Sequence, residues 1–315
     1  MITSSASLGF VFPGQGSQSI GMLAELAGLH PVVREVFTEA SDGAGTDLWT
    51  LSQAGPEAML NRTEFTQPAL LAAGVAVWRA WQSAGGAMPS HLAGHSLGEY
   101  TALVAAGVIS LHDAAHLVRI RGQAMQDAAP EGVGAMAAVL GADDALVEEV
   151  CREIAGPQVV APANYNSPGQ IVIGGHVQAV DAALAMLAER GVRKTVKLAV
   201  SVPSHTPLMR EAANRVGEAM NAYAWHAPTI PVVQNVDASA HASVEAIRDA
   251  LVRQLYLPVQ WTRCVRALGA AGTTRIAECG PGKVLAGLVK RIDKSLEGRA
   301  LGTPAEFDAA IADWR

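Results

Sequence analysis

The sequence predicts an α/β protein in which a small domain is inserted into a large one. Residues 91–106 contain a short apolar stretch, a glycine-flanked turn and a second apolar stretch, which is typical of a strand–turn–helix unit. Residues 135–200 follow the order strand, helix, strand, strand, helix, strand, and alternating strands and helices return afterwards. We therefore expect a large domain of residues 1–130 and 203–315, interrupted by a small domain of residues 131–202.

Local residue patterns predict the helices and strands in residues 1–130, the first segment of the large domain. Thr66 is a suitable N-cap, and Pro68 is tolerated in a first helical turn. Gly107 can end a helix, and Ser110 with Asp113 looks like a capping box for the next one. The expected strands are 8–12 and 91–93, and the expected helices are 20–27, 31–40, 56–61, 66–82, 97–106 and one from the Ser110 cap to residue 128.

The remaining chain contains two patterns. In the small domain we expect strands 135–140, 159–163, 170–173 and 195–200, helices 144–154 and 177–190, and a turn at 166–169. This order is that of a ferredoxin-like unit. After it we expect strands 232–236 and 275–278 and helices 244–256 and 261–270.

Composition and charge narrow the class of protein. Half of the residues are hydrophobic, 17% are charged and the net charge is −6, so nucleic acid is not an expected partner. Residues 1–7 lack the basic region of a signal peptide, and no apolar run reaches the length of a membrane span. Cys151, Cys264 and Cys279 are scattered, which indicates reduced thiols. A cytoplasmic protein without membrane contact is expected.

Gly94 to Gly98 form a G-x-S-x-G pattern, in which a serine sits on a sharp turn between a strand and a helix. The helix N-terminus would place backbone N–H groups near Ser96, where they favour negative charge. The alternative is an ordinary glycine-rich turn with a capping serine. His205 follows later in the chain, and the order serine before histidine is that of an α/β-hydrolase-like domain.

Two longer motifs resemble those of malonyl-CoA:acyl carrier protein transacylases. They are Gly-His-Ser-Leu-Gly-Glu-Tyr at residues 94–100 and Phe-Pro-Gly-Gln-Gly-Ser-Gln at residues 12–18. The resemblance extends over nearly the whole chain and is closest to the free-standing bacterial enzymes. It implies transfer of a malonyl group from coenzyme A to holo acyl carrier protein through a malonyl-serine, in fatty acid biosynthesis. Malonyl-CoA is then a substrate, and no cofactor is implied.

The same resemblance assigns the catalytic groups. Ser96 is the implied nucleophile and His205, in Val-Pro-Ser-His, the implied base. The backbone N–H groups of Gln15 and Leu97 are implied as an oxyanion hole. Arg121 is implied to bind the free malonyl carboxylate, which suits a guanidinium because it grips carboxylates with two parallel hydrogen bonds.

Further residues are implied to support the pocket. They are Gln254, Met125, Asn164, Asn235 and Gln67. Gln254 is expected beside His205. A carboxylate usually orients the histidine of such a site, and the sequence does not single one out; the resemblance implies a backbone carbonyl instead.

Other motifs give weaker indications. The loop at 13–19 lacks the Lys-Ser/Thr pair of a phosphate-binding loop, and Ser19 stands where a dinucleotide fingerprint needs glycine. His112 and His116 have the spacing of a zinc-protease motif, but aspartate replaces its glutamate and no third ligand is evident. No metal site is expected.

Docking of an acidic acyl carrier protein requires a local basic surface. The small-domain cluster is Arg190, Arg193, Lys194 and Lys197, and the C-terminal cluster is Lys283, Lys290, Arg291 and Lys294. A monomer is expected. The competing functions are a serine thioesterase or esterase, a malonyl loader for polyketide synthesis or malonate decarboxylation, and an inactive subunit that binds acyl carrier protein.

Overall fold

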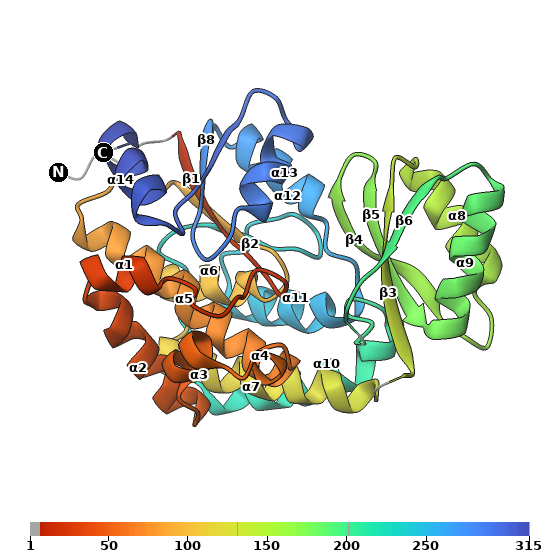
Figure 1. Ribbon diagram of the computed structural model, residues 1–315, viewed down its shortest axis with the longest axis horizontal. Coiled ribbons are helices and arrows are strands. Elements are labelled where there is room, and N and C mark those ends of the chain that lie inside the picture. The colour runs from red at the N-terminus through yellow and green to blue at the C-terminus, as the bar shows by residue number, and fades with distance from the viewer. Residues whose placement is uncertain (1–6, 131, 201, 315) are drawn as a thin grey trace.

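The computed structural model describes residues 7–130, 132–200 and 202–314, which form two lobes built on separate sheets (Figure 1). The small lobe comprises residues 132–200, and the other described residues form the large lobe. Residues 1–6, of the segment predicted to lack a signal peptide, and the predicted domain boundary at residue 131 lie outside the described residues. Among those described, no helix combines the length and apolar character needed to cross a bilayer.

The described strands of the large-lobe sheet all pair in parallel. Their order is β7 (Val232–Val233), β2 (His91–Gly94), β1 (Leu8–Phe12), β8 (Arg275–Glu278) and β9 (Glu297–Ala300). Parallel strands need crossover connections, whose helices bury both faces of the sheet. In β1, Phe10 and Phe12 accordingly lie in the core on one face, and Val11 lies in the core on the other.

The two faces are covered by different helices. The core around Phe10 and Phe12 takes residues from α1 (Ala24–Leu29), α2 (Val32–Ala44), α3 (Leu48–Ala54), α4 (Glu57–Leu60), α5 (Thr63–Ser83), α6 (Gly98–Ala105), α7 (Leu111–Ala128), α10 (Arg210–Ala219), α11 (Val244–Tyr256) and α14 (Pro304–Trp314). The core around Val11 takes residues from α12 (Trp261–Ala270) and α13 (Val284–Ile292).

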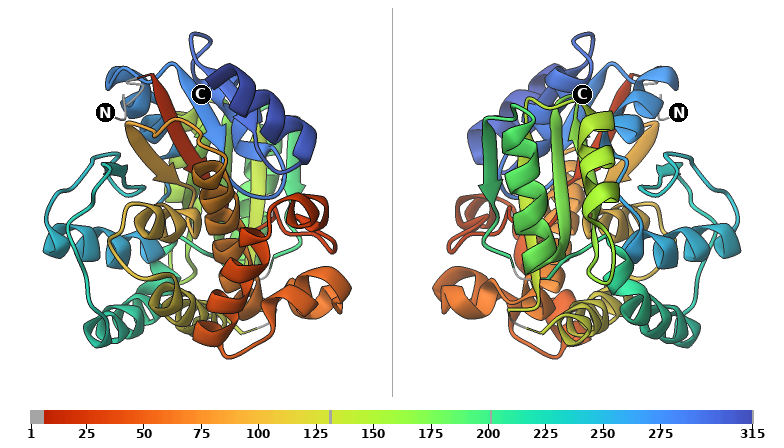
Figure 2. Two further views of the ribbon diagram at one scale, coloured as in Figure 1. Left: turned by 90° about the vertical axis from the view of Figure 1, so that its left-hand side faces the viewer. Right: turned by 90° about the vertical axis from the view of Figure 1, so that its right-hand side faces the viewer.

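The small lobe is an antiparallel sheet with helices on one face. Its strands are β3 (Gly134–Leu140), β4 (Val160–Ser167), β5 (Gln170–His176) and β6 (Lys194–Lys197), in the order β4-β5-β3-β6. The helices α8 (Asp144–Ile154) and α9 (Val177–Glu189) lie on its outer side (Figure 2, right). Met136 and Val172 belong to a separate apolar cluster, distinct from the core under these helices.

Strand β4 connects the lobes through backbone contacts. Tyr165 donates its backbone N–H to the carbonyl of Val259 at 2.9 Å, and Val259 donates to the carbonyl of Ala163 at 2.8 Å. His95 Nε2 also lies 2.8 Å from Asn166 Oδ1. These contacts fix the position of the small lobe over the C-terminal end of β2, where Ser96 follows.

Several predicted elements are confirmed to the residue, namely β1, β8, α8, α11 and α12. The Ser110 cap is also confirmed, because its side chain accepts the N–H of Asp113. The prediction that Thr66 caps α5 is wrong. That helix begins three residues earlier, and the Thr66 hydroxyl donates to the carbonyls of Leu60 and Arg62 from inside it.

Other boundaries differ from the prediction. The first helix begins at Ala24 and not at residue 20, because residues 20–23 form turns. Strand β4 continues to Ser167, so the turn predicted at 166–169 is confined to Pro168 and Gly169. Strand β7 ends at Val233, before the predicted residue 236. The helices α3, α10, α13 and α14 and the strand β9 were not predicted.

Candidate active site

Ser96 lies on a sharp turn between β2 and α6. Its φ of 53° is in the left-handed region, which a residue with a side chain adopts only when its surroundings impose it. The flanking glycines are required by packing: a Cβ on Gly94 would lie 1.9 Å from the backbone of Gly98, and one on Gly98 would lie 2.0 Å from the carbonyl oxygen of Phe12. The turn therefore holds Ser96 in one orientation at the end of the parallel sheet.

His205 contacts Ser96 although it follows it by 109 residues in the chain. Its Nε2 lies 2.7 Å from Ser96 Oγ, and its Nδ1 lies 2.7 Å from the backbone carbonyl oxygen of Gln254. A carbonyl only accepts hydrogen bonds, so Nδ1 carries the hydrogen and Nε2 presents its lone pair to the serine hydroxyl. The group that faces Nδ1 is thus a backbone carbonyl, the arrangement that the family resemblance implies.

The surroundings keep His205 uncharged. The ring is buried, and its burial together with the nearby positive charge of Arg121 lowers the pKa of His205 to about 3. A neutral imidazole can accept the proton of Ser96 without first losing one of its own. The pair is therefore arranged for general-base activation of a serine nucleophile.

Arg121 is the charged group closest to this pair. It projects from α7, is almost fully buried, and its Nη2 lies 3.3 Å from Ser96 Oγ. Its hydrogen bonds go to neutral amide oxygens, from Nη1 to Gln67 Oε1 at 2.7 Å and from Nη2 to Gln254 Oε1 at 3.0 Å. Among the described residues, no carboxylate forms an ion pair with Arg121. The guanidinium can therefore accept an anionic group beside Ser96.

Asn235 and Gln254 form hydrogen bonds with the backbone of Ser96. Ser96 donates its backbone N–H to Asn235 Oδ1 at 2.7 Å, and Asn235 Nδ2 donates to the carbonyl of Gly94 at 2.6 Å. Gln254 Nε2 donates to the carbonyl of Ser96 at 2.9 Å. Both side chains are fully buried and do not line the cavity, so they contact Ser96 from outside it.

A cavity of about 120 Å³ lies between the lobes and contains the Ser96 hydroxyl. The large lobe contributes mainly polar side chains to it, and the small lobe contributes mainly apolar ones. The predicted site residues that line it are Gln15, Gln67, Ser96, Leu97, Arg121, Met125, Asn164 and His205. The residues that the sequence did not indicate are His95, Met136, Leu198, Val200, Val202 and Ser204.

Two backbone N–H groups border the same cavity. Leu97 precedes the first residue of α6, and Gln15 lies in the loop after β1. Within the part of the chain that the structure describes, neither N–H donates a hydrogen bond. The helix start at Leu97 favours negative charge, and the Gln15 N–H is a second free donor in the loop, so both are available to a developing oxyanion.

Glu99 is a buried acid that the sequence analysis missed. It lies in the first turn of α6, is 0% exposed, and accepts the backbone N–H of Asn235 at 2.8 Å and Gln254 Nε2 at 3.1 Å. Burial raises its pKa to about 7. The available signal was that Glu99 is the one charged residue of α6 and belongs to the family motif at residues 94–100.

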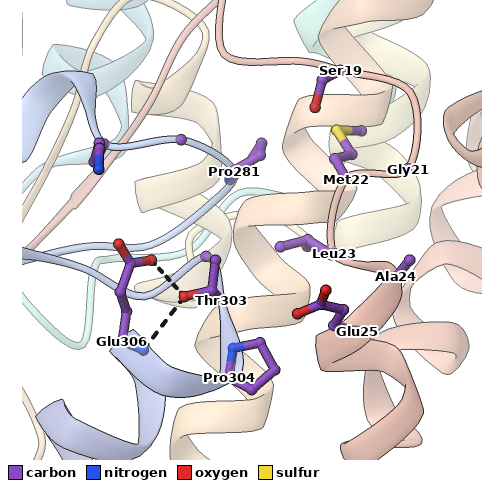
Figure 3. A pocket seen from close by; sticks show the side chains of 13 residues that line it. Ser19, Gly21, Met22, Leu23, Ala24, Glu25, Pro281, Thr303, Pro304 and Glu306 are labelled. Carbon is purple, nitrogen blue, oxygen red and sulfur yellow. Dashed lines mark hydrogen bonds between the residues drawn. The ribbon is translucent and has the colours of Figure 1, made fainter.

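A larger hollow of about 380 Å³ opens elsewhere on the large lobe (Figure 3). It is lined by residues 19, 21–25, 281–283, 302–304 and 306, and Figure 3 shows the hydrogen bonds that join Thr303 to Glu306. None of the residues around Ser96 lines it. His112 and His116, of the zinc-like spacing, also lie apart from the Ser96 cavity, and His116 Nδ1 lies 3.0 Å from the hydroxyl of Tyr223.

Sequence comparison identifies the family. The acyl transferase domain family matches residues 9–300, a range that includes both lobes. The chain belongs to this family. It is 55% identical over 302 residues to the malonyl CoA-acyl carrier protein transacylase of Salmonella typhimurium, over 96% of this chain and 98% of the relative. The family resemblance of the two sequence motifs is thereby confirmed.

Solved structures of transacylases have the same fold. The crystal structure of malonyl-CoA:acyl carrier protein transacylase from Xanthomonas oryzae pv. oryzae superposes with a TM-score of 0.98 at 73% identity, covering 99% of each chain. A malonyl-transacylase in complex with a type II polyketide synthase acyl-carrier protein superposes with a TM-score of 0.96 at 50% identity, covering 98% of this chain and 99% of that one. The mixed α/β fold with a parallel sheet is therefore shared.

Proposed function

We propose that this protein is a malonyl-CoA:acyl carrier protein transacylase that works through a malonyl ester of Ser96. One observation carries the proposal: a buried arginine that forms no ion pair with a described carboxylate lies 3.3 Å from a serine hydroxyl that also contacts a neutral histidine. Serine and histidine alone suit many acyl transfers. Arg121 adds a binding group for an acyl chain that ends in a carboxylate.

The architecture fits this assignment. We propose that the large lobe is an α/β-hydrolase-like domain of residues 1–130 and 203–315, because its parallel sheet carries a serine elbow followed later by the histidine. The strand order β4-β5-β3-β6 with two helices on one face supports a ferredoxin-like small domain of residues 131–202. The site then lies in the seam between two domains, a common place for ligands.

In the first half-reaction His205 Nε2 takes the hydroxyl proton as Ser96 Oγ attacks the thioester carbonyl of malonyl-CoA. The carbonyl oxygen becomes an oxyanion that the backbone N–H groups of Gln15 and Leu97 stabilise. Loss of one such donor commonly costs about 3–4 kcal/mol of barrier stabilisation. The tetrahedral intermediate then expels the coenzyme A thiolate, which receives the proton from His205.

In the second half-reaction the phosphopantetheine thiol of acyl carrier protein gives its proton to His205 and attacks the malonyl ester. Ser96 leaves and recovers the proton, so the enzyme returns to its starting state. Water must not replace the thiol. The apolar wall formed by Met136, Leu198 and Val200 restricts water at this point, which favours transfer over hydrolysis.

The backbone carbonyl of Gln254 orients His205 in this mechanism. It fixes the ring tautomer, but a neutral carbonyl stabilises an imidazolium less than a carboxylate would. A modest base is sufficient because a thioester is more electrophilic than an amide. Gln67, together with Gln254, holds the guanidinium of Arg121, and Met125 and Asn164 form part of the cavity wall.

We propose the C-terminal cluster as the docking surface for acyl carrier protein. Its four basic side chains are exposed, and the lysines among them form no ion pair with a described residue. In the small-domain cluster, by contrast, Arg190 pairs with Glu149 and Glu153, and Lys197 pairs with Asp181. Charge reversal in the true docking cluster raises the KM for acyl carrier protein and leaves the KM for malonyl-CoA unchanged.

The remaining properties follow from the same chemistry. The two half-reactions move a proton and an acyl group and need neither a cofactor nor a metal. We expect a monomer, because all of the groups used above come from one chain. We also expect it to act in the cytoplasm in fatty acid biosynthesis, as the family resemblance implies. A thioesterase, or a malonyl loader for another pathway, would use the same serine, and the experiment below separates the first of these from the transferase.

Intact mass spectrometry after acid quenching tests the proposed function. Wild-type protein mixed with malonyl-CoA is expected to gain one malonyl group, and Ser96→Ala none. Holo acyl carrier protein is expected to discharge the adduct and become malonylated. Release of free malonate without transfer would instead show a hydrolase, and absence of both adduct and turnover would leave a binding subunit.

A further inference from the structure

Glu99 is the centre of a buried hydrogen-bond network for which the sequence motifs indicate no role. Its Oε2 accepts the backbone N–H of Asn235 at 2.8 Å and Gln254 Nε2 at 3.1 Å, and its Oε1 lies 3.4 Å from Gln234 Nε2. The carboxyl group is completely buried and follows Ser96 by three residues. An ionisable group is retained in such a place only when hydrogen bonds offset the loss of water.

The partners of Glu99 are the groups that hold the reactive residues. Asn235 supports Ser96 through the serine N–H and the Gly94 carbonyl. Gln254 contacts three parts of the site: its Nε2 donates to the carbonyl of Ser96, its Oε1 accepts from Arg121, and its backbone carbonyl accepts from His205. One intervening residue, Gln254, therefore separates the Glu99 carboxylate from the nucleophile, the base and the carboxylate-binding arginine.

We propose that Glu99 is a positioning residue of the acyl transfer, which fixes Asn235 and Gln254 and through them aligns Ser96, His205 and Arg121. The proposal rests on the proposed function. Glu99 lines no part of the cavity and touches no reacting atom, so it acts only through these neighbours.

The orientation of the Gln254 amide explains how Glu99 positions Arg121. An amide presents an oxygen on one side and an NH₂ group on the other, and the two ends exchange places in a flip. Glu99 Oε2 already accepts the backbone N–H of Asn235, so it presents an acceptor to Gln254 and selects the orientation in which Gln254 Nε2 faces inward. The Gln254 oxygen is then turned to Arg121. In the flipped orientation two donors would face each other and displace the guanidinium.

The neighbouring Gln234 makes a conservative replacement possible. Its Oε1 is buried and has no hydrogen-bond partner in the described structure. In Glu99→Gln the new oxygen can still accept from Asn235 and Gln254, and the new NH₂ group can donate to Gln234 after that amide flips. Glu99→Gln therefore keeps the positioning contacts, whereas Glu99→Ala removes them all.

The test measures single-turnover acylation of Ser96 by malonyl-CoA and by acetyl-CoA. In Glu99→Ala the malonyl rate is expected to fall about 100-fold or more, because misplacement of reacting groups by about 1 Å costs on that order. The acetyl rate is expected to fall about tenfold, since it does not use Arg121. Glu99→Gln is expected to retain both rates within about threefold. Should Glu99→Ala not fold, Glu99→Met keeps the volume, lacks oxygen acceptors and carries the same expectation.

Glu278 provides the matched control. It is also a fully buried carboxylate with a raised pKa, but its Oε2 accepts the backbone N–H of Ala286 and contacts none of the groups around Ser96. Glu278→Ala is expected to lower the Tm while both acylation rates stay within about threefold of wild type. Equal rates in folded Glu99→Ala and Glu278→Ala would overturn the proposal, as would a large loss in folded Glu99→Gln.

A serine-directed reagent separates this proposal from the proposed function. Inactivation by phenylmethylsulfonyl fluoride requires Ser96 and His205 but no malonyl group, and Glu99→Ala is expected to slow it about tenfold. Wild type that reacts with the reagent but not with malonyl-CoA would refute the transacylase assignment alone. Equal inactivation of wild type, Glu99→Ala and Glu278→Ala would refute the positioning role alone.

Discussion

Two hollows of the molecule, one on the large lobe and one between the lobes, differ in volume and in the burial of their polar groups. The hollow in Figure 3 measures about 380 Å³ and is bordered by exposed turns and the start of α14. The cavity at Ser96 measures only about 120 Å³, but it is bordered by buried polar side chains from helices and strands far apart in the chain. Volume therefore does not identify the reactive site in this protein, whereas convergence of buried polar groups does.

Buried polar groups mark the reactive site because removing a polar group from water costs free energy. A polar group inside a protein is stable only if it is hydrogen-bonded, so a cluster such as Arg121, Gln254 and Glu99 must be specified jointly. The polar groups of the larger hollow remain near water and need no such specification. Changes in the buried cluster should therefore alter the transfer rates, whereas changes in the larger hollow should alter only stability.

Arg121→Ala would abolish the binding group that distinguishes the Ser96 cavity. Malonyl transfer is expected to fall about 100- to 1,000-fold, because leaving one member of a buried charge pair unpaired costs roughly 3–5 kcal/mol. Acetyl transfer is expected to persist or rise, since an acetyl group carries no carboxylate. Both rates are measured by transfer from the coenzyme A thioester to holo acyl carrier protein.

Arg119→Ala is the control for this change. Arg119 lies on the same helix but donates to Thr46 and does not line the cavity, so its loss should leave the malonyl-to-acetyl ratio unchanged. An equal loss of both activities in folded Arg121→Ala would contradict the assigned role.

The pH profile tests whether the cavity shields His205 from protonation. Burial and the Arg121 charge lower its pKa to about 3, so the neutral base persists as the pH falls below its ordinary value near 6.5. Acylation by acetyl-CoA is expected to stay level from pH 8 to 5. An unshifted histidine would instead lose about 30-fold over that range. Single-turnover rates distinguish the two, and a midpoint near 6.5 would contradict the shielding.

Glu278 shows what burial does when no reaction is involved. Burial raises its pKa to about 7, so its contribution to stability is fully present below about pH 4.5 and is lost as the pH rises through 7. Glu278→Gln is expected to gain up to about 3 kcal/mol in free energy of unfolding relative to wild type between pH 4.5 and 8. Urea unfolding at several pH values measures this, and a difference independent of pH would disprove it.

The smallest effect is expected in the larger hollow. Thr303 Oγ accepts the N–H of Glu306 and donates to its carboxylate, which caps α14. Thr303→Ala is expected to lower the free energy of unfolding by about 1 kcal/mol, the usual value of a helix cap. The transfer rates should not change. A tenfold loss of transfer would instead show that the larger hollow takes part in the reaction.

Sequence patterns predicted most elements because their signals are local. The bounds of α8 and α12 follow from apolar residues spaced for a helix, and Ser110 predicts its cap because donor and acceptor lie three residues apart. The prediction for Thr66 was wrong because this residue lies inside the helix, where its hydroxyl donates to the carbonyls of Leu60 and Arg62, six and four residues earlier. Propensity alone does not choose between a cap and such an internal contact.

The α/β class, the serine elbow and, through family motifs, the residues expected to act follow from the amino-acid sequence alone. The contacts among these residues depend on how the chain folds. Ser96 meets His205 across 109 residues, and Glu99 meets Asn235 and Gln254 across 136 and 155 residues. Local patterns specify helices and strands through neighbouring residues, whereas a buried hydrogen-bond network exists only after distant segments have packed and excluded water.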